Sequence, residues 1–410
     1  CAGLHADHGT RLLTGTGVAG LVGTGNLGWP AWGLYLLLSA AAIFLAVRDT
    51  RLTPAVAAAL VLAACALFGT VDADLALVLT AAAGIALLFG GAGIALARRA
   101  EDGPAWGAIG VGGLLAPYVI LVGARFAAMD RIGWAAIALL LALPLLHLVW
   151  RSRHAAVLEP PYDRPLTLAS GGAAAFLALA IVDLAPGTLL PAMLPFAILL
   201  PAVALAEGGR RLGDGGVLRL AWWAAVAALV LMAMMAGGFA DALRVTLSGG
   251  WDVLPVLPGA RDAIVGALVP AALTAAIALR ATSSGTRWRQ YLLGAAGLAA
   301  AAGLYALWKR LFAIGDADAF VADGFLERAL LTQALFVGGW VATRRGWAGV
   351  GRVVTILAAA RVLGLDLIVF NPALVAQAVG PLPIANLLTL HFALAAAWIG
   401  LARAAEPAGR

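Results

Sequence analysis

Apolar windows of about 20 residues, separated by short polar turns, run along almost the whole chain. A helix of about 20 apolar residues is long enough to cross the hydrocarbon core of a bilayer. We therefore predict an all-α polytopic transmembrane helix bundle with short loops. Its thirteen clear spans are predicted at 29–47, 52–71, 75–97, 104–124, 132–150, 166–185, 187–206, 217–236, 263–280, 291–308, 325–343, 350–370 and 382–402.

The beginning of the chain is less clear in pattern. Residues 12–28 are glycine-rich and weakly apolar, so they form either one more packed helix or a re-entrant piece, and the total is 13 or 14 spans. We divide the chain into an N-terminal segment (1–28), the transmembrane bundle (29–402) and a tail (403–410). Because the chain starts at Cys1 rather than at methionine, we expect the later part of a longer protein; an acylated lipoprotein start is the alternative.

Composition agrees with a membrane protein. Hydrophobic residues make up 63% of the 410 residues and charged residues only 12%, whereas soluble domains carry about 25% charged residues. Arginines are concentrated in alternate loops, those after the first, third, fifth, seventh, ninth and eleventh spans. By the positive-inside rule these loops and the C-terminus are cytoplasmic. We therefore attribute the net charge of +6 to arginines that orient the chain in the membrane. We expect no nucleic-acid binding.

The stretch from Arg361 to His391 places polar residues in otherwise apolar sequence. An arginine or aspartate at the centre of a membrane helix costs about 2.5–3.5 kcal/mol, so such residues usually face the protein interior. Arg361 and Asp366 are five residues apart, about 140° around an α-helix, and are not expected to share a face. We expect Arg361 to pair with a carboxylate or with carbonyls of another helix; Asp366, Asp183 and Glu327 are the available carboxylates. An anion- or proton-handling site and a buried ion pair that fixes helix register both remain open.

The other polar candidates have structural explanations as well. Asn371 precedes a proline and is expected to cap the following turn. Asn386 and His391 follow the Gly-Pro turn, five residues apart, and His391 is expected to bond between helices rather than to ligate a metal. Glu327 is predicted in the first turn of its span, where it suits the helix dipole; the functional alternative is an outer vestibule that it shares with the aspartates of 316–323.

Other signals are structural. Three prolines, Pro191, Pro195 and Pro201, predict that the seventh span kinks or breaks, and glycines such as Gly90, Gly93, Gly110 and Gly113 predict close helix contact. No nucleotide-binding, hydrolase or metalloprotease signature is present. We expect no cofactor, no metal and no catalytic set, which favours a non-enzymatic protein without excluding an enzyme.

Three C-terminal stretches, FLERALLTQALFVGGW, RVLGLDLIVFNPAL and GPLPIANLLTLHFALAAAW, resemble a bacterial predicted membrane protein family, domain of unknown function 2339. The resemblance covers roughly the last 90 residues, and its positions are Arg361, Asp366, Asn371, Pro372, Gly380, Pro383 and Asn386. It implies a bacterial inner-membrane location and a longer parent protein. The resemblance does not imply any activity.

Three functions follow as hypotheses. The first is a transporter-like protein, or one that translocates an envelope lipid or glycan precursor, with a polar site around Arg361 and Asp366. The second is a non-catalytic scaffold or accessory subunit of a membrane complex, with a protein partner within the membrane. The third is a membrane enzyme acting on lipid-linked substrates, for which His391 and Glu327 are the expected pair. In each case membrane lipids are partners.

Overall fold

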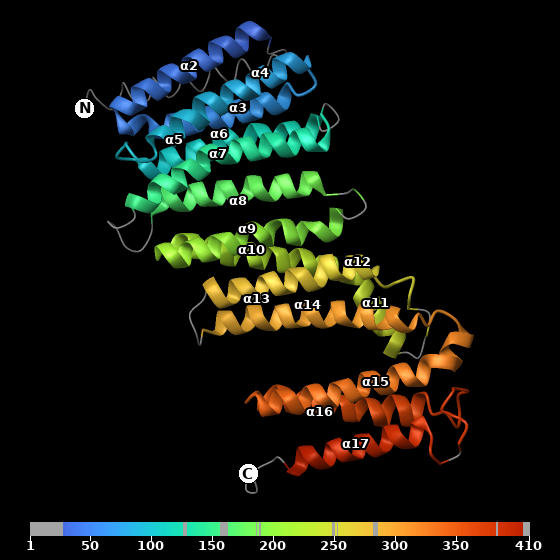
Figure 1. Cartoon of the computed structure of the whole chain (residues 1–410). Coiled ribbons are helices and arrows are strands. Elements are labelled where there is room, and N and C mark those ends of the chain that lie inside the picture. The colour runs from blue at the N-terminus through green and yellow to red at the C-terminus, as the bar shows by residue number, and fades with distance from the viewer. Residues whose placement is uncertain are drawn as a thin grey trace, which may run out of the picture. The chain divides into compact units, whose positions relative to one another are not determined.

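The structure is a computed structural model, and it describes residues 28–125, 129–155, 163–185, 187, 190–247, 251, 253–281, 286–382 and 384–404. The predicted N-terminal segment lies outside these residues except for Gly28, and so does most of the predicted tail. Every regular element in the described part of the chain is a helix (Figure 1), which confirms the all-α prediction.

Ten helical segments of 20 to 26 residues are long and apolar enough to cross a membrane. They correspond one by one to the first ten predicted spans, from Trp29–Arg48 to Arg287–Phe312. The chain is therefore a multi-pass membrane protein. The chain divides into two units, with bounds Cys1–Met232 and Val265–Ala299 (unit 1) and Ala233–Ile264 and Ala300–Arg410 (unit 2), and the described residues within each are compact. A single bundle over 29–402 stays a prediction.

Unit 1 contains most of the long apolar helices. They are α2 (Trp29–Arg48), η1 (Thr50–Leu52), α3 (Thr53–Gly69), α4 (Leu75–Ile85), the π-helix η2 (Ala86–Gly91), α5 (Ala92–Leu96), α6 (Gly103–Arg125), α7 (Arg131–Ala155), α8 (Arg164–Leu184), α9 (Leu190–Leu212), α10 (Gly215–Met234), most of the π-helix η5 (Ile264–Leu268), α13 (Val269–Ala281) and the first half of α14 (Arg287–Phe312).

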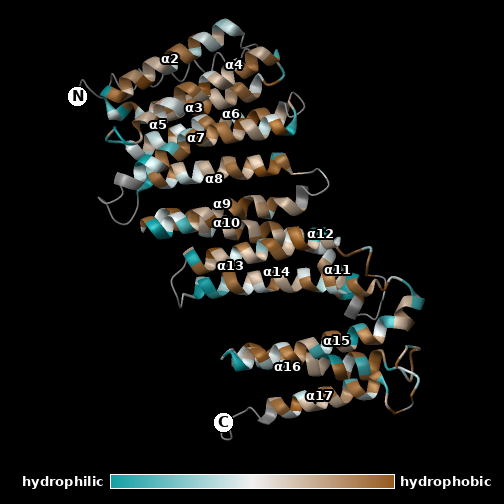
Figure 2. Cartoon of the chain, in the orientation of Figure 1, coloured by the Kyte–Doolittle hydropathy of each residue, from teal (hydrophilic) through white to brown (hydrophobic). Residues whose placement is uncertain are grey.

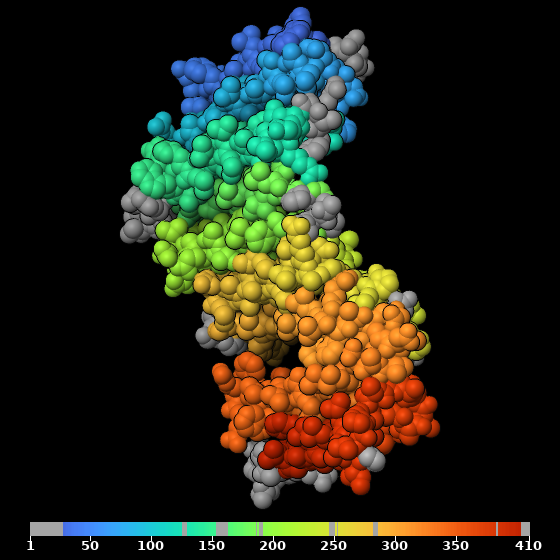
Figure 3. Space-filling view, turned by 45° about the vertical axis from the view of Figure 1, so that its right-hand side comes forward, coloured from blue at the N-terminus to red at the C-terminus, as the bar shows by residue number. Residues whose placement is uncertain are grey.

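Large aromatic side chains fill the core of the α2–α8 part of unit 1. Phe89, Trp106, Trp134 and Phe176 are almost completely buried in one apolar cluster. The helices from α2 to α8, blue to green in the space-filling view, pack into a continuous surface (Figure 3). The outer faces of the same helices are also apolar (Figure 2); Leu87, for example, is 78% exposed. Helices that are apolar all round are typical of membrane spans.

Glycines bring α5 and η2 against α6, as predicted. A Cβ atom on Gly93 would lie less than 3.0 Å from the backbone of Gly110, and one on Gly113 would lie equally close to the backbone of Gly90. The two helices therefore approach each other through backbone rather than through side chains, the contact that small residues permit in membranes.

The seventh span was predicted to kink or to break; the structure contains no break, and a kink stays a prediction. Helix α9 is assigned as one helix from Leu190 to Leu212, with Pro195 and Pro201 inside it. Proline removes one helical hydrogen bond, but packing against neighbouring helices can compensate for that loss in a membrane span. Helix α9 packs between α8 and α13, which supports it along its length.

Unit 2 contains fewer and more polar helices. They are α11 (Gly237–Leu247), α12 (Ala260–Ala263), the second half of α14, α15 (Ala317–Arg344), α16 (Ala348–Arg361), the π-helix η6 (Val362–Val369) and α17 (Leu387–Ala404). The last three predicted spans are helical, but they are not among the ten long apolar segments. Charged residues interrupt α15 and the α16–η6 segment, and the apolar part of α17 is short. That these three segments cross the membrane therefore stays a prediction.

Helix α15 begins earlier than predicted, at Ala317 instead of 325. The side chain of Asp316 caps it by accepting a hydrogen bond from the backbone amide of Ala319 at 2.8 Å. Glu327 consequently lies about three turns into the helix rather than in its first turn, and the predicted dipole role for Glu327 is wrong.

The π-helix η6 changes the geometry of the Arg361–Asp366 pair. In a π-helix the backbone bonds join residues five apart, as the amide of Phe370 and the carbonyl of Leu365 show at 2.6 Å. Residues five apart then turn toward the same side. Arg361 and Asp366 both contact α15, at Thr332 and Arg328 respectively. The prediction that they face different sides is wrong because it assumed an α-helix.

The glycine contact between α5 and α6 gives the first testable prediction. We expect Gly93→Ala to lower the free energy of unfolding by about 1–3 kcal/mol, the usual cost of overpacking, because the added methyl group meets backbone that cannot move aside. The matched control is Gly33→Ala in α2, where a Cβ atom would meet nothing within 4 Å. Unfolding of both variants in detergent micelles measures the difference; equal stability of the two would contradict the close contact.

Candidate functional site

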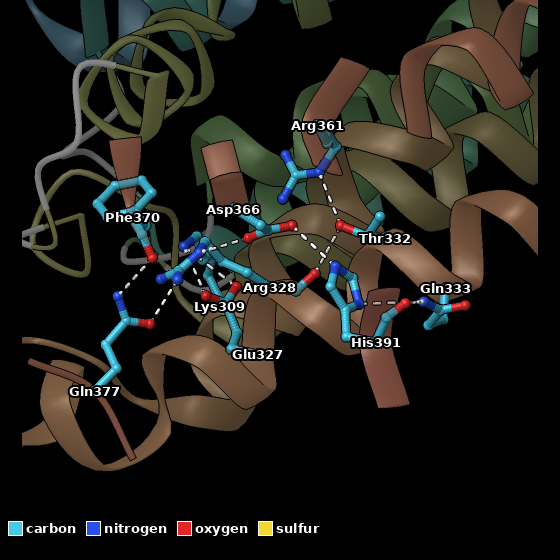
Figure 4. Close-up of polar contacts among 10 residues, drawn as sticks. All are labelled: Lys309, Glu327, Arg328, Thr332, Gln333, Arg361, Asp366, Phe370, Gln377 and His391. Atoms are coloured by element: carbon cyan, nitrogen blue, oxygen red, sulfur yellow. Dashed lines mark hydrogen bonds and ion pairs between the residues drawn. The ribbon is translucent and has the colours of Figure 1, made fainter. Parts of the chain in front are cut away.

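A network of charged and polar side chains joins the helices of unit 2 (Figure 4). Helix α15 supplies its centre, with Glu327 (2% exposed), Arg328 (5%) and Thr332 (0%) all buried. Arg328 and Thr332 are four residues apart and so lie one turn apart on the same face. This face of α15 meets α16, η6 and α17.

Arg328 is held by two partners on other segments. Its Nε donates to Asp366 Oδ1 at 3.2 Å, and its Nη2 donates to Gln377 Oε1 at 2.5 Å. The guanidinium carbon lies 4.4 Å from the ring centroid of Phe370 and 5.6 Å from that of Phe320. A guanidinium stacked on aromatic rings gains cation–π attraction in addition to its ion pair.

Asp366 also binds His391, as Figure 4 shows, and the surrounding bonds define the proton on that ring. The indole Nε1 of Trp398 can only donate, and it donates to Gln333 Oε1 at 3.1 Å. The Gln333 amide nitrogen therefore donates to His391 Nδ1, also at 3.1 Å. With Nδ1 as acceptor, Nε2 carries the proton and donates to Asp366 Oδ2 at 3.1 Å. These bonds fit a neutral imidazole, and they confirm that His391 is bonded between helices.

Glu327 belongs to a second part of the network, on the side of α14. It accepts from the indole of Trp308 at 3.1 Å and from Nζ of Lys309 at 3.2 Å. The aspartates at 316, 318 and 323 are exposed, as expected for solvated carboxylates. They are therefore not brought together with the buried Glu327 in the vestibule that the sequence suggested.

Arg361 has no carboxylate partner among the described residues. Its side chain is half-buried, and its Nε donates to the hydroxyl of Thr332 at 3.5 Å. The expected ion pair with Asp366 or Glu327 is absent because Arg328 and Lys309 pair with those carboxylates instead. The network thus contains three permanent cations and two carboxylates.

A small pocket opens beside Arg328, with a volume of about 20 Å³. This is room for about one water molecule. It is lined by Trp251, Lys309, Ile314, Phe320, Glu327, Arg328, Leu365 and Phe370. Within the described part of the chain, Nη1 of Arg328 is buried and has no hydrogen-bond partner. A buried donor without a partner carries the cost of its lost hydration, typically about 1–3 kcal/mol, and calls for an explanation.

The two asparagines have the capping roles typical of this residue. Asn371 Oδ1 accepts from the backbone amide of Ala373 at 3.0 Å, which confirms that it caps the turn after Pro372. Asn386 Oδ1 accepts from the backbone amide of Thr389 at 2.9 Å and so caps α17. The loop between these two asparagines places Gln377 within hydrogen-bond distance of Arg328.

Asp183 is not part of this network. It lies in unit 1, buried, and accepts a hydrogen bond from the hydroxyl of Tyr118 at 2.6 Å. Tyr118 in turn stacks edge-on against Trp134 and Phe176. Asp183 therefore anchors a separate aromatic cluster.

Sequence reasoning missed the residue at the centre of the network. Neither Arg328 nor Lys309 is among the polar candidates drawn from the sequence. The available signal was that both cations stand next to long apolar runs, and that Glu327 and Arg328 lie four to six residues before Thr332 and Gln333 in the same helix. Among the described residues, no group of three or more His, Cys, Asp or Glu side chains is placed to hold a metal ion.

The buried ion pair gives a second prediction. We expect Asp366→Asn to lower the free energy of unfolding by about 3 kcal/mol, because it leaves the buried Arg328 without its charge partner. The matched control is Asp241→Asn in the same unit, whose pair with Arg244 spans 3.8 Å between exposed side chains and should contribute at most about 0.5 kcal/mol. Reversible unfolding in mixed micelles measures both; a loss at Asp366 no larger than at Asp241 would contradict the arrangement.

No family model, curated protein or solved structure matches this chain. The resemblance of the last 90 or so residues to the bacterial membrane family therefore stays a prediction, and the function has to be argued from the site alone.

Proposed function

We propose that the protein is transporter-like and binds an anionic group of an envelope lipid or glycan precursor in unit 2, at the charge network of α14, α15 and η6. The observation that carries this proposal is Nη1 of Arg328, a buried donor without a partner in the described residues. It belongs to a side chain that lines a pocket together with Lys309. A phosphate or carboxylate oxygen is the acceptor that a guanidinium binds best.

The charge balance of the network supports an anionic ligand. Lys309, Arg328 and Arg361 are cations, Glu327 and Asp366 are carboxylates, and His391 is bonded as a neutral ring. One positive charge is therefore left over in a largely buried region. An anion would neutralise it, and the gain is larger than in water because the surroundings screen charge weakly. Of these three cations, Arg361 is the one without a carboxylate partner among the described residues, and its Nε donates to the hydroxyl of Thr332.

The pair of Asp366 and His391 supports coupling to protons. Carboxylates and histidines inside membrane proteins often form proton relays, and these two side chains are each about 1% exposed. An anion bound to Arg328 competes with Asp366 for the guanidinium. In the proposal, Asp366 then takes up a proton from solvent and returns it when the anion leaves.

The size of the pocket limits what the described conformation can hold. About 20 Å³ accommodates a water molecule but no phosphate group. The conformation therefore corresponds, in this proposal, to a closed state, and binding requires α15 to separate from η6. The rings of Trp251, Phe320 and Phe370 at the pocket wall would contact the apolar part of the precursor.

The other two hypotheses have less support. His391 and Glu327, the pair expected for an enzyme, bind separate partners, Asp366 and Lys309. No contact in the described residues favours a scaffold over a transporter. A bacterial inner membrane belongs to the proposal and is supported by the resemblance of the C-terminal stretches.

Binding of a lipid phosphate tests this function. In isothermal titration calorimetry of the detergent-solubilised protein, we expect a short-chain polyprenyl phosphate to bind and the uncharged polyprenol not to bind. Arg361→Gln should weaken binding about tenfold, equivalent to about 1.4 kcal/mol, and Arg328→Gln should abolish it. Arg328→Lys keeps the charge and should retain part of the affinity, which separates loss of binding from loss of folding.

Arg244→Gln is the matched control, an exposed arginine of the same unit, and should bind as the wild type does. Proton uptake on binding, followed with a pH indicator in weak buffer, should be smaller in Asp366→Asn than in the wild type. Equal binding of polyprenol and its phosphate, or unchanged binding in a folded Arg361→Gln, would overturn the proposal.

A further inference from the structure

Unit 1 contains a larger pocket, remote in sequence from the network of unit 2. It lies between α5 and α7, with a volume of about 330 Å³, the lower end of the range of small-molecule sites. Its basic side chains are Arg98, Arg99, His147 and Arg151, and its apolar wall is formed by Gly91, Ile94, Ala95, Pro144 and Leu148.

The cations of this pocket have different roles. Arg98 is already engaged, because its Nε donates to the hydroxyl of Ser152 at 2.8 Å and it forms an ion pair with Asp163. Arg99 and Arg151 are exposed, and neither has a partner among the described residues. Two cations are therefore available at the rim for an anion.

The apolar wall follows from local backbone features. Gly91 is the last residue of η2, and a Cβ atom on it would meet nothing within 4 Å. Gly93, two residues later, packs against α6 instead. The side of α5 at Gly91 thus remains open, and Pro144 and Leu148 of α7 lie across the opening.

The pocket combines two surfaces that one molecule would have to match. Its rim is basic and its wall is apolar: Arg98 and Arg99 follow α5 and Arg151 lies near the end of α7, whereas the wall residues lie further along these segments. Both basic ends belong to loops that the arginine pattern assigns to the cytoplasmic side. Trp150, whose ring lies 5.9 Å from that of His147, is 52% exposed, as is common for tryptophan at a membrane interface.

We infer that this pocket binds an anionic phospholipid from the surrounding cytoplasmic leaflet. The lipid phosphate lies between Arg99 and Arg151, with His147 beside it, and one acyl chain follows the wall from Gly91 to Ile94. Basic pockets between membrane helices on the cytoplasmic side are suited to such headgroups. A free phosphate ion would satisfy the rim but leave the apolar wall unused.

Native mass spectrometry of the purified protein, delipidated and then mixed with phosphatidylglycerol or with phosphatidylcholine of the same acyl chains, tests this inference. The wild type should retain one phosphatidylglycerol in preference to phosphatidylcholine, and inorganic phosphate should not displace it. Arg99→Gln and Arg151→Gln should each weaken retention about fivefold, equivalent to about 1 kcal/mol per basic residue.

The apolar wall is tested separately with Gly91→Leu. The leucine side chain occupies open space, so the protein should fold normally while lipid retention falls about tenfold. Matched controls are Gly33→Leu, also in open space, and Arg51→Gln, an exposed arginine in another predicted cytoplasmic loop; both should retain lipid as the wild type does. Equal retention in the Gly91 and Gly33 variants, equal losses in the Arg151 and Arg51 variants, or displacement by inorganic phosphate would each overturn the inference.

Discussion

Charge that is buried away from water must find a partner within the protein, and in unit 2 this constraint determines which segments meet. The guanidinium of Arg328 cannot be left unpaired at 5% exposure without a cost of several kcal/mol. It binds Asp366 on η6 and Gln377 on the following loop. Asp366 then holds His391 of α17, and Glu327 beside Arg328 holds Lys309 of α14. Two ion pairs, Arg328–Asp366 and Glu327–Lys309, together with the bond from His391 to Asp366, thus link four helical elements.

Unit 1 is held together differently. Most of its helix surface is apolar, and lipid tails solvate apolar side chains as well as a neighbouring helix does. Close contact therefore depends on shape, through Gly93 against Gly110 and through large buried rings such as Trp106. Directional polar bonds specify the contacts of unit 2, and backbone approach specifies those of α5 and α6 in unit 1.

The hydropathy pattern was sufficient for the ten long helices, because length and apolarity alone define a span. It was insufficient for the partners of Arg361 and Asp366. The angle between Arg361 and Asp366 was calculated for an α-helix, whereas residues 362–369 form a π-helix. Nothing in the composition of these residues indicates a π-helix. The capping roles of Asn371 and Asn386 were easier to predict, because capping depends only on neighbours in sequence. Arg328 was missed because burial is a property of the assembled helices.

The central claim is that Arg328 and Asp366 form the energetic centre of unit 2. A double-mutant cycle with Arg328→Met, Asp366→Leu and the double variant, each unfolded reversibly in mixed micelles, measures the coupling free energy of the pair directly. We expect a coupling of at least about 2 kcal/mol, with the double variant more stable than either single variant because neither Arg328 nor Asp366 is left without its charge partner. A coupling near zero, with the two losses simply adding, would contradict it.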